Sequence, residues 1–203
     1  MAATNFALGY WRHIVAVLVV VLLGFLFYGQ YQSWHLGDQR DSARQIFEAE
    51  RALRDAEDPQ PELFGQVADA LMAVDARGMA KSEALLKAAE LYRLAEQPEK
   101  QRSTLELAAG ASEGVLAYAA DAAIANLDLE AGDGDAATAR LRRLMDSEQG
   151  FLAQQAALDL ALMYEHLDRT ADARAVYDEF TARFPESELG DEVRERRAKL
   201  GDG

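Results

Sequence analysis

Apolar residues recur at helical spacing along the chain beyond Asp38, and no segment there alternates apolar and polar residues as a strand would. Proline and glycine interrupt this pattern, since neither is favoured inside a helix. The pattern predicts helices over residues 38–57, 61–77, 80–95, 98–109, 112–131, 134–147, 149–167, 170–183 and 187–200. The short loops between them predict antiparallel neighbours and an all-α fold.

Residues 80–185 repeat at an offset of 36 positions. Three register positions carry the repeat: Tyr92, Asp128 and Tyr164; Ala89, Ala125 and Ala161; Leu105, Leu141 and Tyr177. A small residue lets paired helices approach, and a large residue at constant offset fills the gap to the next pair. We therefore predict a right-handed α-solenoid of three helix pairs, spanning 80–110, 112–147 and 149–185.

The ends of this stack are expected to be capped, because a solenoid exposes an apolar face at each end. Residues 187–200 carry charges of both signs and predict a polar capping helix. Residues 38–77 predict a helical hairpin. Its contacts are expected to join Ile46, Phe47 and Leu53 to Leu63, Phe64, Val67 and Leu71. The helical domain as a whole is predicted over 38–203.

The last repeat has the most regular pattern of large and small residues. It carries, in order, Leu160, Ala161, Tyr164, Ala173, Tyr177 and Pro185. This order and spacing resemble the tetratricopeptide consensus, with Ala157 in place of the large aromatic residue at the repeat start. The middle repeat has Asp128 where a tyrosine is expected, and the first has Gln101 where alanine is expected. A period of 36 rather than 34 suggests slightly longer turns. The resemblance implies a protein-binding module.

An apolar run of different character precedes the repeats. Residues 14–28 are all apolar or glycine, and aromatic residues flank them on both sides. With its flanks the run reaches about 20 residues, enough to cross a hydrocarbon layer of about 30 Å. We predict a short tail over 1–12 and one transmembrane anchor over 13–34. A cleaved signal peptide is the rival interpretation, but no pair of small residues at the cleavage spacing follows the run.

Positive charge does not settle the orientation of this anchor, because Arg12 lies before it and Arg40 and Arg44 lie after it. A short tail before a span is typical of anchors whose N-terminus stays in the cytoplasm. One anchor followed by degenerate repeats resembles the YfgM-like ancillary subunits of the bacterial SecYEG translocon. The segment 184–187 and the helix after it also resemble repeats of the envelope proteins BamD and YbgF. These resemblances imply a scaffold at the bacterial inner membrane, with its repeats in the periplasm.

Charge restricts the partners of the repeat domain. All 35 Asp and Glu residues but only 20 of the 21 Lys and Arg residues lie beyond residue 30, which gives that part a net charge near −15. Such a field repels nucleic acids and anionic lipids. A protein partner with basic or neutral character is easier to accommodate. The chain has no cysteine, so disulfides, thiolate nucleophiles and a lipid-modified N-terminal cysteine are excluded.

Catalytic or metal-binding chemistry has little support in the sequence. The three histidines, His13, His35 and His166, are not spaced for a metal site with other strong ligands. The acidic residues over 128–135 lack the spacing of a calcium loop and are interpreted as a solvated turn between helices. No phosphate-binding or nucleophile motif occurs. We expect no enzyme activity, no catalytic residue, no cofactor and no small-molecule substrate.

The first helices of stacked pairs line a concave surface, so the repeat register predicts a protein-binding groove. Its residues are expected to be Leu86, Glu90, Arg93, Ala122, Asn126, Leu129, Gln155, Leu158, Leu162 and Glu165. Alternatively, the leucines among them belong to the core between repeats. A mixed apolar and acidic groove suits an amphipathic helix or a basic extended segment. Two functions follow: a membrane-tethered scaffold for another protein, or a structural membrane protein that associates with itself.

Overall fold

A computed structural model describes residues 41–148 and 150–201. The chain divides into two units at Gln45, and the second unit begins at Ile46. The helices of this unit are α2 (Arg51–Asp55), α3 (Pro61–Met72), α4 (Gly78–Leu94), α5 (Pro98–Ala111), α6 (Gly114–Glu130), α7 (Gly134–Ser147), α8 (Gly150–His166), α9 (Thr170–Arg183) and α10 (Gly190–Lys199). No strand occurs among the described residues, in agreement with the predicted all-α fold.

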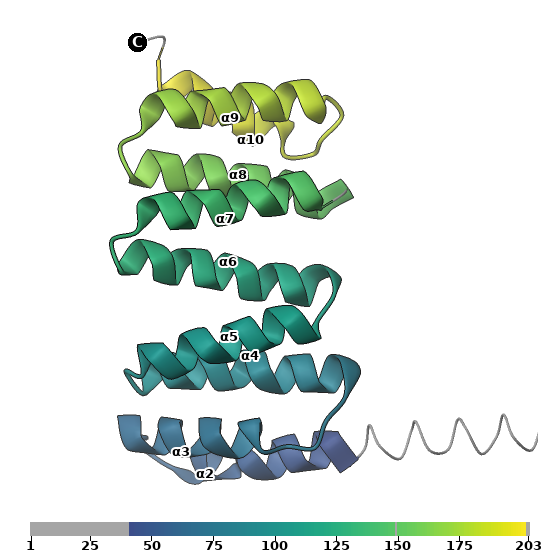
Figure 1. The fold of residues 1–203 in the computed structure, drawn as a ribbon, viewed down its shortest axis with the longest axis vertical. Helices are drawn as coiled ribbons and strands as arrows, with labels where there is room; N and C mark the ends of the chain where they lie inside the picture. The colour runs from purple at the N-terminus through teal and green to yellow at the C-terminus, as the bar shows by residue number, and fades with distance from the viewer. Residues whose placement is uncertain (1–40, 149, 202–203) are drawn as a thin grey trace, which may run out of the picture. The chain divides into compact units, whose positions relative to one another are not determined.

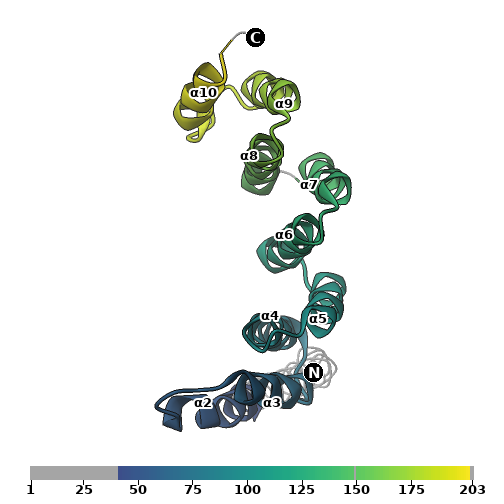
Figure 2. The same cartoon turned by 90° about the vertical axis from the view of Figure 1, so that its left-hand side faces the viewer.

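The helices from α4 to α9 form three antiparallel pairs, as the repeat register predicts (Figure 1). Each helix packs on the next, and α6 also contacts both α4 and α8. In Figure 2 the first helices α4, α6 and α8 lie on one side of the stack, and the second helices α5, α7 and α9 lie on the other. Helix α10 packs on α9 at the C-terminal end. The predicted solenoid and its C-terminal capping helix are thus present.

The repeat length of 36 is taken up by helices rather than by turns. Every first helix has 17 residues and every second helix has 14, while the turns have only three or two. The expectation of slightly longer turns than in a 34-residue repeat stays a prediction. Each three-residue turn contains one residue with positive φ, at the equivalent positions Glu96, Gly132 and Asp168. The shared backbone turn explains why the register stays constant along the chain.

Buried side chains confirm the register positions that were expected to pack. Ala89, Ala125 and Ala161 are at most 2 % exposed, so neighbouring helices approach closely over them. The large residues at the second position, Leu105, Leu141 and Tyr177, are equally buried. The buried residues form three clusters along the stack, and helix α6 contributes residues to the clusters on both of its sides.

The N-terminal end differs in detail from the predicted hairpin. Ile46 is buried as expected, but Phe47 is 61 % exposed, and the guanidinium of Arg54 lies over its ring at 3.9 Å. The predicted helix over 61–77 ends at Met72, because the chain then turns so that Val74 and Ala76 enter the core. This turn brings the chain to the start of α4.

The predicted membrane span over 13–34 and the tail over 1–12 lie outside the described residues. Among the residues that the structure does describe, no helix combines the length and the apolar character needed to cross a membrane.

Candidate protein-binding surface

The predicted groove residues lie on the three first helices, but they differ in exposure. Glu90, Arg93 and Asn126 are exposed. The half-buried members are Leu86, Ala122, Leu129, Gln155, Leu162 and Glu165. Leu158 is only 6 % exposed and belongs to the core between α6 and α9, so its placement in the groove was wrong. Leu158 thus follows the alternative interpretation. Leu86, Leu129 and Leu162 are half-buried and pack against the core clusters, with part of their surface still accessible.

A hollow between α6 and α8 contains four of these residues. Its volume is about 340 Å³, and it is lined by Ala122, Asn126, Leu129, Leu141, Asp159, Leu162, Met163 and His166. The floor is mainly aliphatic, while an amide, a carboxylate and an imidazole lie among the lining residues. Such a mixture can hold an apolar side chain and orient a polar or cationic group beside it.

Asp159 is held in place by two neighbours. The phenol of Tyr118, on α6, donates a hydrogen bond to Oδ2, and Gln155 Nε2 donates one to Oδ1 at 2.9 Å. Burial, together with the hydrogen bond to Asp159 and the charge of that carboxylate, raises the pKa of Tyr118. The phenol therefore stays protonated as a donor, and the carboxylate faces the hollow in a fixed orientation.

A second hollow, of about 480 Å³, lies between α4 and the segment around α2. Its lining residues are Glu50, Leu53, Arg54, Leu86, Lys87, Glu90 and Leu91. Lys87 Nζ lies 2.9 Å from Glu50, and this hydrogen bond raises the pKa of Lys87. Glu90 accepts two hydrogen bonds from Arg93, at 2.9 and 2.5 Å, which lower the pKa of Glu90. The predicted groove residues Glu90 and Arg93 thus neutralise each other at the rim.

Glu165, the last predicted residue, lies at the C-terminal end of the same side. It accepts a hydrogen bond from the phenol of Tyr177. It also lines a small hollow of about 220 Å³ with residues of α10: Glu192, Glu195, Arg196 and Lys199. Across residues 41–148 and 150–201, no group of three His, Asp or Glu side chains is placed to hold a metal ion.

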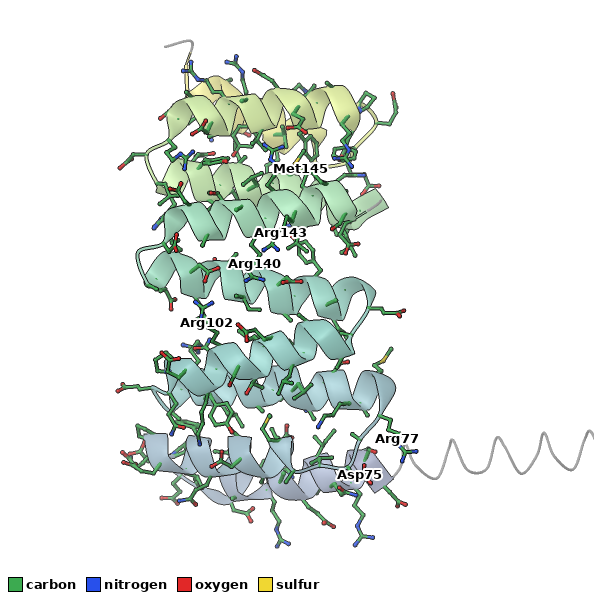
Figure 3. The ribbon with its side chains drawn as sticks, viewed as in Figure 1. Asp75, Arg77, Arg102, Arg140, Arg143 and Met145 are labelled. Carbon is green, nitrogen blue, oxygen red and sulfur yellow. The ribbon has the colours of Figure 1, made fainter. Side chains whose placement is uncertain are left out.

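Asp128 is the residue for which the sequence interpretation was most clearly wrong. It was expected in a solvated turn, yet it is only 8 % exposed. Its carboxylate lies 2.7 Å from Arg102 of α5 and 3.5 Å from Arg140 of α7, and these two arginines lie on either side of α6 (Figure 3). Because Asp128 shares a register position with Tyr92 and Tyr164, that register already indicated an inward-facing side chain.

Tyr92, at the same register position, provides a testable contact. Its phenol donates to Asp69 Oδ1 at 2.6 Å, and Lys100 Nζ lies 2.9 Å from the same oxygen. These bonds, that of Tyr92 first, lower the pKa of Asp69. The ionised form is therefore favoured in the folded protein. Its stabilisation is present above the unfolded pKa of Asp69 and is lost as pH falls through the folded pKa.

We expect Tyr92→Phe to raise the pKa of Asp69 toward its ordinary value, because the stronger of the two donors is removed. Carboxyl ¹³C chemical shifts followed through an acid titration would measure the change. The same substitution at Tyr118, whose phenol bonds Asp159 instead, should leave the titration of Asp69 unchanged. An unaltered Asp69 titration in Tyr92→Phe would contradict this assignment.

Similarity to known proteins agrees with this architecture. No curated protein and no solved structure matches the chain. Residues 5–201 match the family described as a tetratricopeptide repeat-like domain, whose members are typically non-enzymatic modules for protein interaction. The match extends over all three helix pairs and the surface that their first helices form. The chain therefore belongs to the tetratricopeptide repeat-like domain family.

Proposed function

We propose that this chain is a membrane-anchored scaffold whose first helices bind another protein at a membrane complex. The observation that carries the proposal is the pair of accessible hollows on α4 and α6–α8, each lined by three leucines and at least one carboxylate. A surface of this kind binds protein segments, since the apolar floor supplies affinity and the charges select the partner.

The proposed anchor is the apolar run over residues 14–28, which is long enough with its flanks to span a bilayer. Tethering raises the effective concentration of a partner in the same membrane, so weak intrinsic affinity suffices. The layout resembles YfgM-like subunits of the SecYEG translocon. We therefore place the anchor in a bacterial inner membrane, the N-terminus in the cytoplasm and the repeats in the periplasm, with a role in protein translocation or envelope assembly.

The proposed partner offers an amphipathic helix or an extended segment with basic residues. Asp159 lines the hollow between α6 and α8, and the part of the chain beyond residue 30 carries a net charge near −15. A cationic side chain entering this hollow would meet a carboxylate already oriented by Tyr118 and Gln155. Preorganisation of this kind favours binding because little further ordering is needed.

Crosslinking of the intact protein in native membranes, followed by mass spectrometry, tests this proposal. We expect translocon or envelope-assembly subunits to be captured by the full chain but not by a version lacking residues 1–34. Capture of the chain alone would overturn the scaffold function and support the structural, self-associating alternative.

A single substitution in the hollow should weaken the same crosslinks. Asn126→Arg places a bulky cation at an exposed position of α6, where it would fill the hollow and repel a basic partner. We expect roughly tenfold weaker capture, which corresponds to about 1.4 kcal/mol of binding free energy. Ala139→Arg, at an exposed position of α7 outside that lining, is the matched control. Equal capture by both variants would show that the partner binds elsewhere.

A further inference from the structure

One exposed apolar side chain projects near the start of each first helix. Met79, Val115 and Phe151 are the second residues of α4, α6 and α8, and they are 77, 67 and 62 % exposed. They lie 36 positions apart and therefore share one register position. A single exposed apolar residue is ordinary in a soluble domain. An exposed apolar residue at the same position of all three repeats forms a row on the surface, and such a row indicates a site of interaction.

The backbone before each of these residues is also the same. Gly78, Gly114 and Gly150 have φ values of +54, +59 and +58°, and no neighbouring atom lies within 4 Å of where a Cβ would stand. Glycine is thus needed there for its conformation and not for lack of space. Since the glycine conformation and the start of the helix that follows are repeated, the three side chains occupy equivalent places. Figure 1 shows the starts of α4, α6 and α8 along one edge of the stack.

Ile46, the first residue of the second unit, packs near the same edge of the stack. Ile46 belongs to a buried cluster with Val74, Ala76 and Ala84, and these residues flank the beginning of α4. Figure 3 places Asp75 and Arg77 at this edge. Only residues 29–45 separate Ile46 from the apolar run over 14–28, and an extended chain spans at most about 3.6 Å per residue. A span at 14–28 would therefore keep Ile46, at the α4 end of this edge, within about 60 Å of the bilayer.

We propose that the edge formed by Met79, Val115 and Phe151, here called the apolar edge, rests in the interfacial layer of the bilayer that holds the chain. This inference depends on the membrane anchoring proposed above. The charged residues beside the edge are of both signs: Arg77 and Lys81 next to Met79, Glu113 next to Val115, and Glu148 near Phe151. With no excess of cations there, and a net charge of −14 for the whole chain, the lipid surface that fits is zwitterionic rather than anionic.

This contact would fix the orientation of the scaffold. Helices that begin at the bilayer run away from it, so the row of first helices stands upright and the hollows on α4 and α6–α8 face sideways along the membrane. Weak insertion of these three side chains into the lipid interface is enough to hold the domain there, because the anchor already keeps it at high local concentration near the bilayer. A partner segment leaving a membrane complex nearby would then meet the hollows without first moving into bulk solvent.

Single-cysteine labelling tests the apolar edge directly, since the chain has no cysteine of its own. Val115→Cys and Phe151→Cys in the full chain would carry an environment-sensitive fluorophore in phosphatidylcholine vesicles that contain spin-labelled lipid. Both side chains are more than half exposed, so the substitutions leave the packing intact. Ala131→Cys, in the exposed turn at the other end of α6, is the control.

The expected result is a blue-shifted emission at 115 and 151, quenched roughly twofold by labelled lipid, because interfacial side chains enter to about 5–10 Å. Position 131 should stay unquenched. If the protein floats with the vesicles but all three positions are equally unquenched, the apolar edge does not contact lipid, while the anchor stands. If the protein does not float at all, the proposed anchoring is wrong and this inference falls with it.

Discussion

Phe180→Ala is expected to lower the free energy of unfolding by about 3–5 kcal/mol, the usual effect of removing a large aromatic ring from a packed core. Phe180 is 1 % exposed and lies in the cluster that joins α6 to α10. Its ring packs edge-to-face on that of Phe184 with the centroids 5.2 Å apart. Denaturant unfolding followed by circular dichroism would measure the loss.

Phe151→Ala is the matched control for this prediction. The same atoms are deleted, but Phe151 is 62 % exposed, so stability should change by no more than about 0.5 kcal/mol. Hydrogen exchange adds a spatial readout, since each helix pair contacts mainly its neighbours. In Phe180→Ala, protection should fall in α8, α9 and α10 and persist in α3 and α4. Uniform loss of protection would mean that the stack unfolds as one cooperative body.

Asp128→Asn is expected to cost about 2 kcal/mol, because it removes the charge that neutralises two arginines while keeping the shape of the side chain. The side chain of Asp128 is 10 % exposed, and those of Arg102 and Arg140 are 32 % and 23 % exposed. Partial hydration of the arginines keeps the loss below that of a fully buried pair. Thermal or denaturant unfolding of the two proteins would give the difference.

Asp121→Asn is the control that separates the effect of losing a buried charge from the effect of losing an exposed ion pair. Asp121 lies 2.8 Å from Arg140, but its side chain is 29 % exposed, and Arg140 is the one cation that pairs with it among the described residues. The loss should be at most about 1 kcal/mol, as for exposed pairs. Equal losses from the two substitutions would contradict the view that Asp128 holds α5, α6 and α7 together from within the core.

The helix pairs could be predicted because residues with the same packing role in a solenoid recur in the sequence at a constant offset. Ala89, Ala125 and Ala161 must all be small for the same reason, and one register revealed all three. Asp128 could not be placed so easily, because its charge suggested a solvated turn. Its partners come from the helices on either side, and their side chains cannot be located from local spacing alone.

The groove was predicted less completely than the fold for a similar reason. Leu158 and Leu162 lie one turn apart on α8, yet the first is buried and the second lines the hollow. A rotation of the helix by less than one residue decides between these outcomes. Asp159 was missed because its significance arises from Tyr118, 41 positions earlier in the chain. The exposure of Phe47 likewise depends on how the N-terminal segment packs. This segment precedes the repeats, so no equivalent position in another repeat indicates which of its side chains are buried.

Because each helix packs mainly on its neighbours in sequence, the effect of a bound partner on helix fluctuations extends only a short way along the stack. Helix α6 contacts α5, α7 and, more weakly, α4 and α8, and among the described helices every substantial contact joins neighbours or next-nearest neighbours. A partner seated on α6 and α8 would stiffen those helices and the pairs beside them, while the far end of the stack keeps its own fluctuations. Occupancy of the two hollows should thus be nearly independent. A protein of this construction would behave as a row of separate contacts rather than as a switch.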